Sequence, residues 1–460
     1  MLPTLRWFQQ SLIDRSRDAY RSGRKAVLVV SPTGSGKTYF FCAVVLGALQ
    51  RGSVIYILAH RQELIDQIVT ALAAFGIECD VLCPGYPRRN EPVTVASVQT
   101  LIRRIDSLPA PDLIVIDEGH HVSKGNTWSK ILTAWKSAKV LSVTATPIRT
   151  DGRGLGEHFD KLIVGPSVQE LIDEGYLARP RVFAPPTIDV SGLHTLAGDY
   201  IASETETRVN KPSVMGDALS HYRQHADGKP ALAFCVSVQH AIDVAAHFRN
   251  AGYSAVMLKG GMDRQLRRQT LEDFKRGAIN LIASCEIFVE GVDLPGVHVG
   301  IFLRPTQSLG LWRQMCGRIL RPAEGKEYAI LLDHAGNCQR LGLPTDEPKW
   351  TLTMDEEREK KKKSVSVRVC AKCFAASSAR ALACSNCGEP FPVTPRSKVE
   401  ERDGELVEIT PEMIARKQER REQGRADSLE ALREIERRKG YKSGWADHVY
   451  AARQKKRAAR

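Results

Sequence analysis

Short apolar runs alternate with helix-like segments along most of this chain. In the first part of the chain these runs are residues 26–30, 54–58, 94–96, 113–116 and 140–143. Runs without a polar residue at every second position are typical of strands buried on both faces of a parallel sheet. Helix-like segments such as residues 63–75 lie between several of them. The pattern therefore predicts an α/β fold in which helices cover both faces of a parallel sheet.

The same alternation returns after a proline-containing stretch at residues 180–191, which we interpret as a connector. The later apolar runs are residues 231–234, 255–258, 280–283, 299–302 and 328–332. We therefore expect two parallel-sheet domains in series. The expected organisation is a first sheet domain at 1–180, a linker at 181–205, a second sheet domain at 206–345, a charged linker at 346–366, a four-cysteine module at 367–395 and a basic helical tail at 396–460.

Basic residues outnumber acidic ones by 66 to 53 among 460 residues, which gives a formal net charge of +13. A basic balance favours a polyanionic partner, but charge alone does not separate that from an ordinary basic surface. No apolar run approaches the length that spans a bilayer, and the N-terminus lacks the apolar core of a secretory signal. We therefore expect a cytoplasmic protein with reduced cysteines and no membrane partner.

Residues 31–38 read Ser-Pro-Thr-Gly-Ser-Gly-Lys-Thr and lie between an apolar run and an apolar helix start. Glycines in such a loop let backbone N–H groups turn toward an anion, and the following helix adds its positive N-terminal end. The spacing predicts that Lys37 contacts the β- and γ-phosphates of ATP and that Thr38 holds Mg²⁺. A plain strand-to-helix turn is the alternative. The expected nucleotide-binding residues of this loop are Thr33, Gly34, Ser35, Gly36, Lys37 and Thr38.

Two carboxylates follow the apolar run at residues 113–116, namely Asp117 and Glu118. Residues at the carboxyl end of a parallel strand face the ligand crevice of such a sheet. We expect Asp117 to hold Mg²⁺ and Glu118 to orient and deprotonate the attacking water. A solvated turn after a strand is the alternative, and the neighbouring phosphate loop disfavours it.

The segment 117–120, Asp-Glu-Gly-His, resembles the box that names the DEAD/DEAH-box group of superfamily 2 helicases. Residues 142–147, Ser-Val-Thr-Ala-Thr-Pro, are similar to the motif that couples hydrolysis to motion in that family, and residues 5–9 are similar to its adenine-reading segment. The chain thus resembles a helicase of the type III restriction or phage type. The resemblance implies two tandem RecA-like domains and a contact between Gln9 and the adenine edge.

The second half carries further matches to the same family. Residues 314–321 fit the pattern Gln-x-x-Gly-Arg-x-x-Arg, which implies that Gln314, Arg318 and Arg321 complete the ATP site, with both arginines facing the γ-phosphate. Residues 290–295 resemble the motif that bridges ATP and nucleic acid, which adds Gly291 and Asp293 to the nucleotide-binding set. By the same resemblance, the expected nucleic-acid contacts are Arg61, Thr100 and Ser284.

Four cysteines form two Cys-x-x-Cys pairs separated by ten residues: Cys370, Cys373, Cys384 and Cys387. Two such pairs can bring four thiolates to one tetrahedral Zn²⁺. Disulfides and redox-active dithiols are the alternatives, and a reducing compartment disfavours the first. We expect one structural zinc ion in a ribbon-like module that docks nucleic acid or a protein partner. The tail beyond it is rich in Arg, Glu and Ala and is expected to be helical.

These features favour an ATP-dependent helicase or translocase that acts on DNA in replication, recombination or repair. An RNA helicase is the first alternative, and an ATP-operated nucleic-acid-binding switch or scaffold without strand separation is the second.

Overall fold

The computed structural model describes residues 2–87, 89–149, 154–184, 190, 192–196, 198–285, 294, 296–353, 367–392, 423, 426 and 428–458. The chain divides into two compact units, Met1–Pro392 and Val393–Arg460. The first unit contains both large sheets. Among the described residues, no helix has the length and apolar character needed to cross a bilayer.

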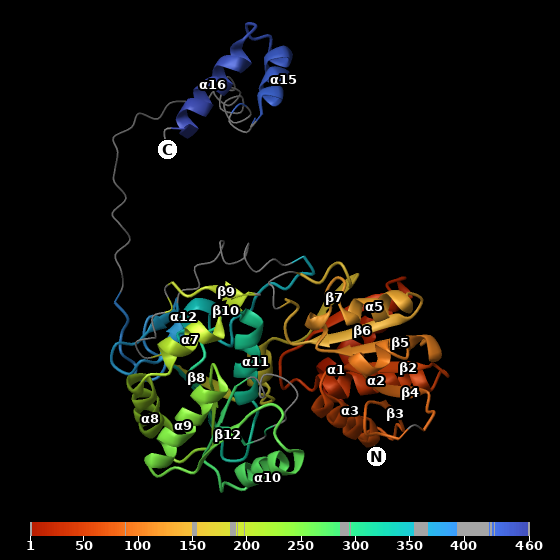
Figure 1. Cartoon of the computed structure of the whole chain (residues 1–460), viewed down its shortest axis with the longest axis vertical. Coiled ribbons are helices and arrows are strands. Elements are labelled where there is room, and N and C mark those ends of the chain that lie inside the picture. Colours follow the sequence, from red (N-terminus) through yellow and green to blue (C-terminus); the bar gives the residue numbers. More distant parts are fainter. Residues whose placement is uncertain are drawn as a thin grey trace. The chain divides into compact units, whose positions relative to one another are not determined.

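The first sheet is parallel and has the strand order β3-β4-β2-β5-β6-β1-β7 in the described part of the chain (Figure 1). Its strands are β1 (Ala26–Val30), β2 (Ile55–Ala59), β3 (Asp80–Leu82), β4 (Val93–Ser97), β5 (Leu113–Asp117), β6 (Lys139–Thr144) and β7 (Lys161–Val164). Successive residues of β1 contribute to opposite clusters: Val27 and Val29 join one, and Leu28 joins the other. The apolar runs therefore form strands buried on both faces, as predicted.

Helices cover the two faces of this sheet. One face packs against α1 (Trp7–Arg21), α2 (Lys37–Leu49) and α3 (Gln62–Ala74), which share a cluster of buried side chains with the sheet. The other packs against α4 (Val98–Ile102) and α5 (Thr127–Ala134). The short helix α6 (Val168–Asp173) follows β7, and its buried Leu171 and Ile172 join the core of the second sheet.

The second sheet is also parallel, with the order β12-β13-β11-β14-β15-β8. Its strands are β8 (Arg179–Phe183), β11 (Ala231–Phe234), β12 (Ala255–Leu258), β13 (Leu281–Ser284), β14 (Val299–Phe302) and β15 (Tyr328–Asp333). Its helices are α8 (Pro212–Ala226), α9 (Val238–Asn250), α10 (Arg264–Lys275), α11 (Leu309–Ile319) and α12 (Asn337–Leu341). The two sheets confirm the prediction of tandem parallel-sheet domains.

The stretch expected to be a connector holds regular structure. It includes most of β8, the antiparallel pair β9 (Thr195–Leu196) and β10 (Asp199–Tyr200), and the first half of α7 (Ala202–Val209). Pro180 lies within β8, which is the edge strand of the second sheet. Proline is tolerated at a sheet edge because its missing N–H removes no internal ladder bond. Pro180, one of the prolines that suggested a connector, is thus compatible with a strand.

The cysteine segment forms a small hairpin, β16 (Val367–Val369) and β17 (Ala376–Ser378). It attaches to the end of edge strand β8, where the Ala184 N–H donates to the carbonyl of Phe374 at 2.8 Å. Phe183 and Ala375 form an antiparallel bridge at the same place. Buried Cys370 and Cys384 belong to the same apolar cluster as Phe183. The hairpin therefore continues the second sheet domain.

The second compact unit contains the helices α15 (Leu429–Lys439) and α16 (Trp445–Ala458), which pack through Leu432, Ile435 and Ala446. Ser428 caps α15, since its hydroxyl accepts from the N–H of Ala431 at 3.1 Å. Gly440 follows α15 with a φ of 69°, a conformation that glycine adopts readily and that ends many helices. The two helices agree with the expected helical tail over the described part of residues 396–460.

Candidate nucleotide site

A cavity of about 670 Å³ joins the phosphate loop of the first sheet domain to the end of α11 in the second. Its lining includes predicted site residues from three segments far apart in sequence: Thr33, Gly34, Gly36, Lys37, Thr38, Asp117, Glu118, Arg318 and Arg321. The fold brings them together because β1 and β5 are parallel strands, so their carboxyl ends point the same way. Both ends lie beside the C-terminal end of α11. The arrangement has the shape and charge to hold a polyphosphate.

The phosphate loop depends on two glycines in the left-handed region, Gly34 with φ 89° and Gly36 with φ 79°. Ser31, where the usual pattern has glycine, donates a hydrogen bond from its hydroxyl to that of Ser35 at 2.7 Å. The departure at position 31 is therefore accommodated inside the loop. Lys37 lies curled into the loop, with its Nζ 3.3 Å from the carbonyl oxygen of Ser31.

Burial lowers the pKa of Lys37, and the nearby Glu118 and Asp117 carboxylates oppose that shift. Asp117 ends β5, and its Oδ1 accepts from the N–H of Glu118 at 3.0 Å. Glu118 adopts φ 55° and ψ 56°, a left-handed conformation that is uncommon outside glycine. Both carboxylates are buried, so a lysine and a metal ion are the partners their negative charge favours.

The acidic box also contacts the segment that follows β6. His120 Nδ1 lies 3.4 Å from Glu118 Oε2 and 3.0 Å from the hydroxyl of Thr144. That hydroxyl donates to the carbonyl of Thr146 at 2.9 Å. Gly310, in the first turn of α11, lies so close to Thr146 that a Cβ at 310 would be 3.0 Å from its hydroxyl oxygen. A chain of contacts therefore runs from the carboxylate pair to the helix that carries the arginines.

Three predicted residues are buried and do not line the described cavity. Ser35 is buried, and Gln314 is buried on α11. The amide nitrogen of Gln9 donates to the carbonyls of Ser35 at 3.3 Å and Gly36 at 3.0 Å. The Gln9 side chain thus holds the phosphate loop in this structure, and its contact with adenine stays a prediction. Gly291 and Asp293 lie outside the described residues.

Arg6 and Tyr176 line the same cavity and were not predicted. The Arg6 guanidinium carbon lies 4.2 Å from the centroid of the Tyr176 ring. Arg6 lies three residues before Gln9 in the same predicted segment, residues 5–9. That proximity could have indicated that Arg6 also lines the cavity. Tyr176 follows α6 and carries no local signal, because only the fold brings it to the cavity.

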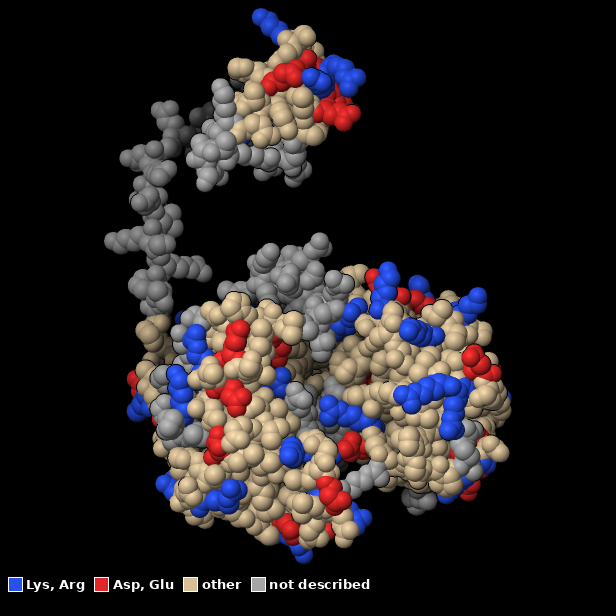
Figure 2. All heavy atoms as spheres, viewed as in Figure 1, with Lys and Arg blue, Asp and Glu red and all other residues tan. Residues whose placement is uncertain are grey.

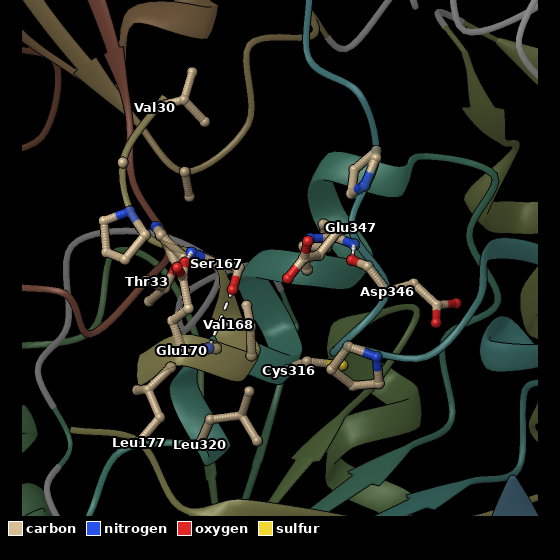
Figure 3. Close-up of a pocket in the computed structure, with 18 of the residues that line it drawn as sticks. Val30, Thr33, Ser167, Val168, Glu170, Leu177, Cys316, Leu320, Asp346 and Glu347 are labelled. Carbon is tan, nitrogen blue, oxygen red and sulfur yellow. Dashed lines mark hydrogen bonds between the residues drawn. The ribbon is translucent and has the colours of Figure 1, made fainter. Parts of the chain in front are cut away.

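A second cavity of about 200 Å³ lies on the other side of Thr33, between the segment from Val164 to Glu170, α11 and residues 344–350 (Figure 3). Arg313 of α11 donates to the carbonyl of Asp346 there, and its guanidinium carbon lies 5.6 Å from the ring of Trp350. The N–H of Gly156, in the first sheet domain, donates to the carbonyl of Leu352 at 2.9 Å. Residues 343–352 therefore pass from α11 back to the first sheet domain.

The predicted nucleic-acid contacts lie near the carboxyl ends of three strands. Arg61 follows β2, and its Nε donates to the imidazole of His60 at 3.3 Å. Thr100 lies in α4, which follows β4. Ser284 ends β13 and is buried. None of the three lines the described 670 Å³ cavity.

The thiols of Cys370, Cys373, Cys384 and Cys387 all lie within 4.8 Å of one another. The two Cys-x-x-Cys turns are alike: the N–H of Phe374 donates to the carbonyl of Cys370, and the N–H of Gly388 to that of Cys384. Phe374 adopts φ 57° where Gly388 has φ 73°. A residue other than glycine therefore takes the left-handed position in the first turn. Four converging thiols fit one tetrahedral metal ion.

Two family models match the chain. Residues 2–149 match "Type III restriction enzyme, res subunit", and residues 210–323 match "Helicase conserved C-terminal domain". The matched ranges contain the phosphate loop and acidic box in the first case and α11 in the second.

Among curated proteins, a 51.5 kDa protein of a Lactococcus phage is 30% identical over 84% of this chain and 83% of its own length. The Saccharomyces cerevisiae protein IRC3, which carries the name of an ATP-dependent helicase, is 29% identical over 73% of this chain. The alignment covers 52% of IRC3, so this chain spans about half the length of that relative.

Among solved structures, a fragment described as an HsdR subunit of a type I restriction enzyme from Vibrio vulnificus YJ016 superposes with a TM-score of 0.60. It is 22% identical, and the match covers 74% of this chain and 66% of that chain. This likeness supports the fold.

Proposed function

The chain belongs to the superfamily 2 helicases, which are ATP-hydrolysing enzymes, and from this membership we propose that it is a DNA-stimulated ATPase that translocates along DNA or separates its strands. One observation carries the proposal. The phosphate loop, the carboxylate pair and two arginines from the other sheet domain line a single cavity.

In the proposed mechanism, Lys37 and the loop N–H groups bind the β- and γ-phosphates of ATP. Thr38 and Asp117 would hold Mg²⁺, and the ion would supply positive charge to neutralise the phosphates. Glu118 orients the attacking water and accepts its proton. Arg318 and Arg321 stabilise the negative charge of the transition state, as arginine fingers do.

Hydrolysis would be coupled to motion because the site is divided between two domains. The loop and the carboxylates belong to the first sheet domain, and both arginines belong to the segment 318–321 of the second. Loss of the γ-phosphate removes the group that both sides bind, so the domains are then free to separate. Thr144 and Thr146 touch both the acidic box and α11, which supports a role in passing the change between them.

One observation favours DNA as the polynucleotide. The family model that matches the first domain is named for a restriction enzyme subunit. The net charge of +13 suits the phosphate backbone of DNA and of RNA alike. Figure 2 shows basic side chains dispersed over both sheet domains on one face, so charge alone does not mark the path of the strand. We place Arg61, Thr100 and Ser284 on that path.

The test measures ATP turnover with no polynucleotide, single-stranded DNA, duplex DNA, forked DNA and RNA, and measures strand separation on the forked substrate. We expect DNA to raise turnover, and Lys37→Ala to abolish it. Greater stimulation by RNA would support the RNA helicase alternative. Stable ATP binding without turnover in the presence of every polynucleotide would support the switch alternative.

We also propose that Cys370, Cys373, Cys384 and Cys387 hold one structural Zn²⁺. Their convergence on one point and the similar turns of the two pairs support this. The hairpin would then present a surface for nucleic acid or a protein partner. Metal analysis of the purified protein should find about one zinc per chain, and a metal-free protein with free thiols would contradict the proposal.

A further inference from the structure

Arg321 lies beyond the end of the helix that brings it to the nucleotide cavity. Helix α11 ends at Ile319, and Arg321 is two residues later. Its direction therefore depends on backbone that no helical hydrogen bond fixes, since the last carbonyls of a helix have no partner within it. Something else must hold this segment in place.

The ammonium group of Lys326 binds the backbone of this segment. Its Nζ donates to the carbonyl of Arg321 at 2.7 Å and also to the carbonyl of Ile319. A third bond, at 2.6 Å, goes to the carbonyl of Val297, just before β14. The carbonyl between the first two, that of Leu320, accepts from the N–H of Ala178 at 2.7 Å. Three successive carbonyls at the end of α11 are thus all bound.

The local sequence explains how Lys326 reaches this place. Its own N–H donates to the carbonyl of Ala323 at 3.1 Å, and Gly325 has a φ of 69°. This tight turn reverses the chain after α11 and brings the Lys326 side chain to the carbonyls at the end of that helix. An ammonium group has three donors on one atom, which matches three carbonyls, and the C-terminal end of a helix favours a cation.

Stability alone is a poor explanation for a lysine here. Burial, and then the positive charge of Arg321, lower the pKa of Lys326 to about 7. A second cation beside Arg321 is therefore held at an electrostatic cost. A function that depends on the placement of Arg321 explains why this residue type occupies the position.

We propose that Lys326 is the positioning residue of the arginine finger Arg321, because it binds the carbonyl of Arg321 itself and so fixes the backbone from which the guanidinium reaches the γ-phosphate. The inference rests on the proposed function, in which Arg321 stabilises the transition state. Lys326 is not among the described residues that line the nucleotide cavity, and it acts through Arg321.

The test is a double-mutant cycle on the full chain with Lys326→Met, Arg321→Ala and the combination, measured as kcat and KM for ATP with saturating duplex DNA. Misplacing a catalytic group by about 1 Å costs up to roughly 100-fold, so we expect Lys326→Met to lower kcat by roughly 10- to 100-fold. We expect the affinity for ADP, which lacks the γ-phosphate, to change by less than about twofold. In the Arg321→Ala background, Lys326→Met should have no further effect on kcat.

Lys275→Met is the matched control, because Lys275 lies exposed in the last turn of α10, away from the cavity. If Lys326→Met lowers kcat by the same factor with and without Arg321, Lys326 stabilises the fold but does not act through Arg321. The inference is then wrong. If Arg321→Ala keeps the wild-type kcat, the assignment of Arg321 in the proposed function fails instead. Should Lys326→Met not fold, Lys326→Arg and Lys326→Gln decide: the charged variant should retain more kcat, and equal loss in two folded variants would overturn the inference.

Discussion

Gly317 of α11 lies against the Thr33 side chain of the phosphate loop, so the backbone of this helix packs directly on the first sheet domain. A Cβ at position 317 would lie 2.5 Å from the Cβ of Thr33. Glycine at this place lets the helix backbone approach the loop closely. The neighbouring residue, Arg318, lines the nucleotide cavity, and so does Thr33. The contact therefore sets how near the arginines come to the phosphates.

Gly317→Ala should lower kcat by roughly 10- to 100-fold, because the added methyl group separates α11 from the phosphate loop and moves Arg318 away from its ligand. Steady-state ATP turnover measures this, and thermal unfolding measures whether the fold survives. Gly47→Ala is the control, since Gly47 is also helical and a Cβ there meets only the Arg17 side chain at 3.6 Å. That control should leave kcat unchanged and stabilise α2 by about 0.5–1 kcal/mol. Equal kcat in both variants would contradict the prediction.

Gly119→Ala should impair folding and turnover together. A Cβ at position 119 would overlap the hydroxyl of Ser142, which explains why this chain has glycine between Glu118 and His120. Overpacking of this kind costs about 1–3 kcal/mol. Ser142→Ala removes the hydroxyl, which donates a hydrogen bond to the carbonyl of Ile116 at 3.4 Å. The double variant Gly119→Ala/Ser142→Ala should therefore recover most of the lost stability in thermal unfolding, and an additive loss would refute this account.

Removal of the proposed zinc ion should destabilise the second sheet domain. Cys384 is buried in the cluster that includes Phe183 of β8, so loss of the thiolate site releases part of that core. We expect Cys384→Ser or strong chelation to lower Tm by roughly 5 °C or more, since one kcal/mol shifts the Tm of a domain of this size by about 2–4 °C. Cys83→Ser, outside the cluster, is the control. An unchanged Tm after complete loss of zinc would exclude a structural role.

Turnover should fall as the pH rises through about 7, the pKa to which burial and Arg321 lower Lys326. Below that pH the ammonium donates to three carbonyls, and above it one donor is lost. The sign for stability is opposite, because a lysine with a depressed pKa releases its proton on folding, so the free energy of unfolding rises between pH 7 and about 10.4. His298, also nearby, has a pKa lowered first by burial and then by Lys326, so it is already neutral in this range.

Lys326→Arg isolates the effect of Lys326 deprotonation on turnover, because a guanidinium keeps its charge over the whole pH range measured. The ratio of wild-type to Lys326→Arg kcat, measured from pH 6.5 to 9, should decline with a single transition. A constant ratio would show that the protonation of Lys326 does not influence turnover.

Most of the strands that the sequence predicted are interior strands buried on both faces, and the half-buried edge strand β12 is the exception. Strands β3, β7 and β8 escaped prediction because β3 is three residues long and includes Asp80, β7 begins with exposed Lys161, and β8 contains Pro180. All three lie at sheet edges, where one side of the strand faces no partner and apolar residues are not required.

The phosphate loop and the acidic box could be predicted because the functional residues of each are consecutive in the sequence, as Lys37 and Asp117 illustrate. Tyr176 and Lys326 were not, because each acquires its role from segments distant in sequence or from a turn. A lysine after a glycine is unremarkable in a sequence. Only the fold shows three carbonyls converging on its ammonium group.

The hairpin at the end of β8 has a consequence for solubility. An edge strand presents unpaired N–H and C=O groups, and such an edge is a template for pairing with another chain. Here Phe374 and Ala375 occupy the last residues of that edge. If the cysteines are oxidised or the proposed zinc is lost, the hairpin would leave the end of β8 exposed. The failure of such a chain would then begin as self-association of the second domain rather than as loss of ATP binding.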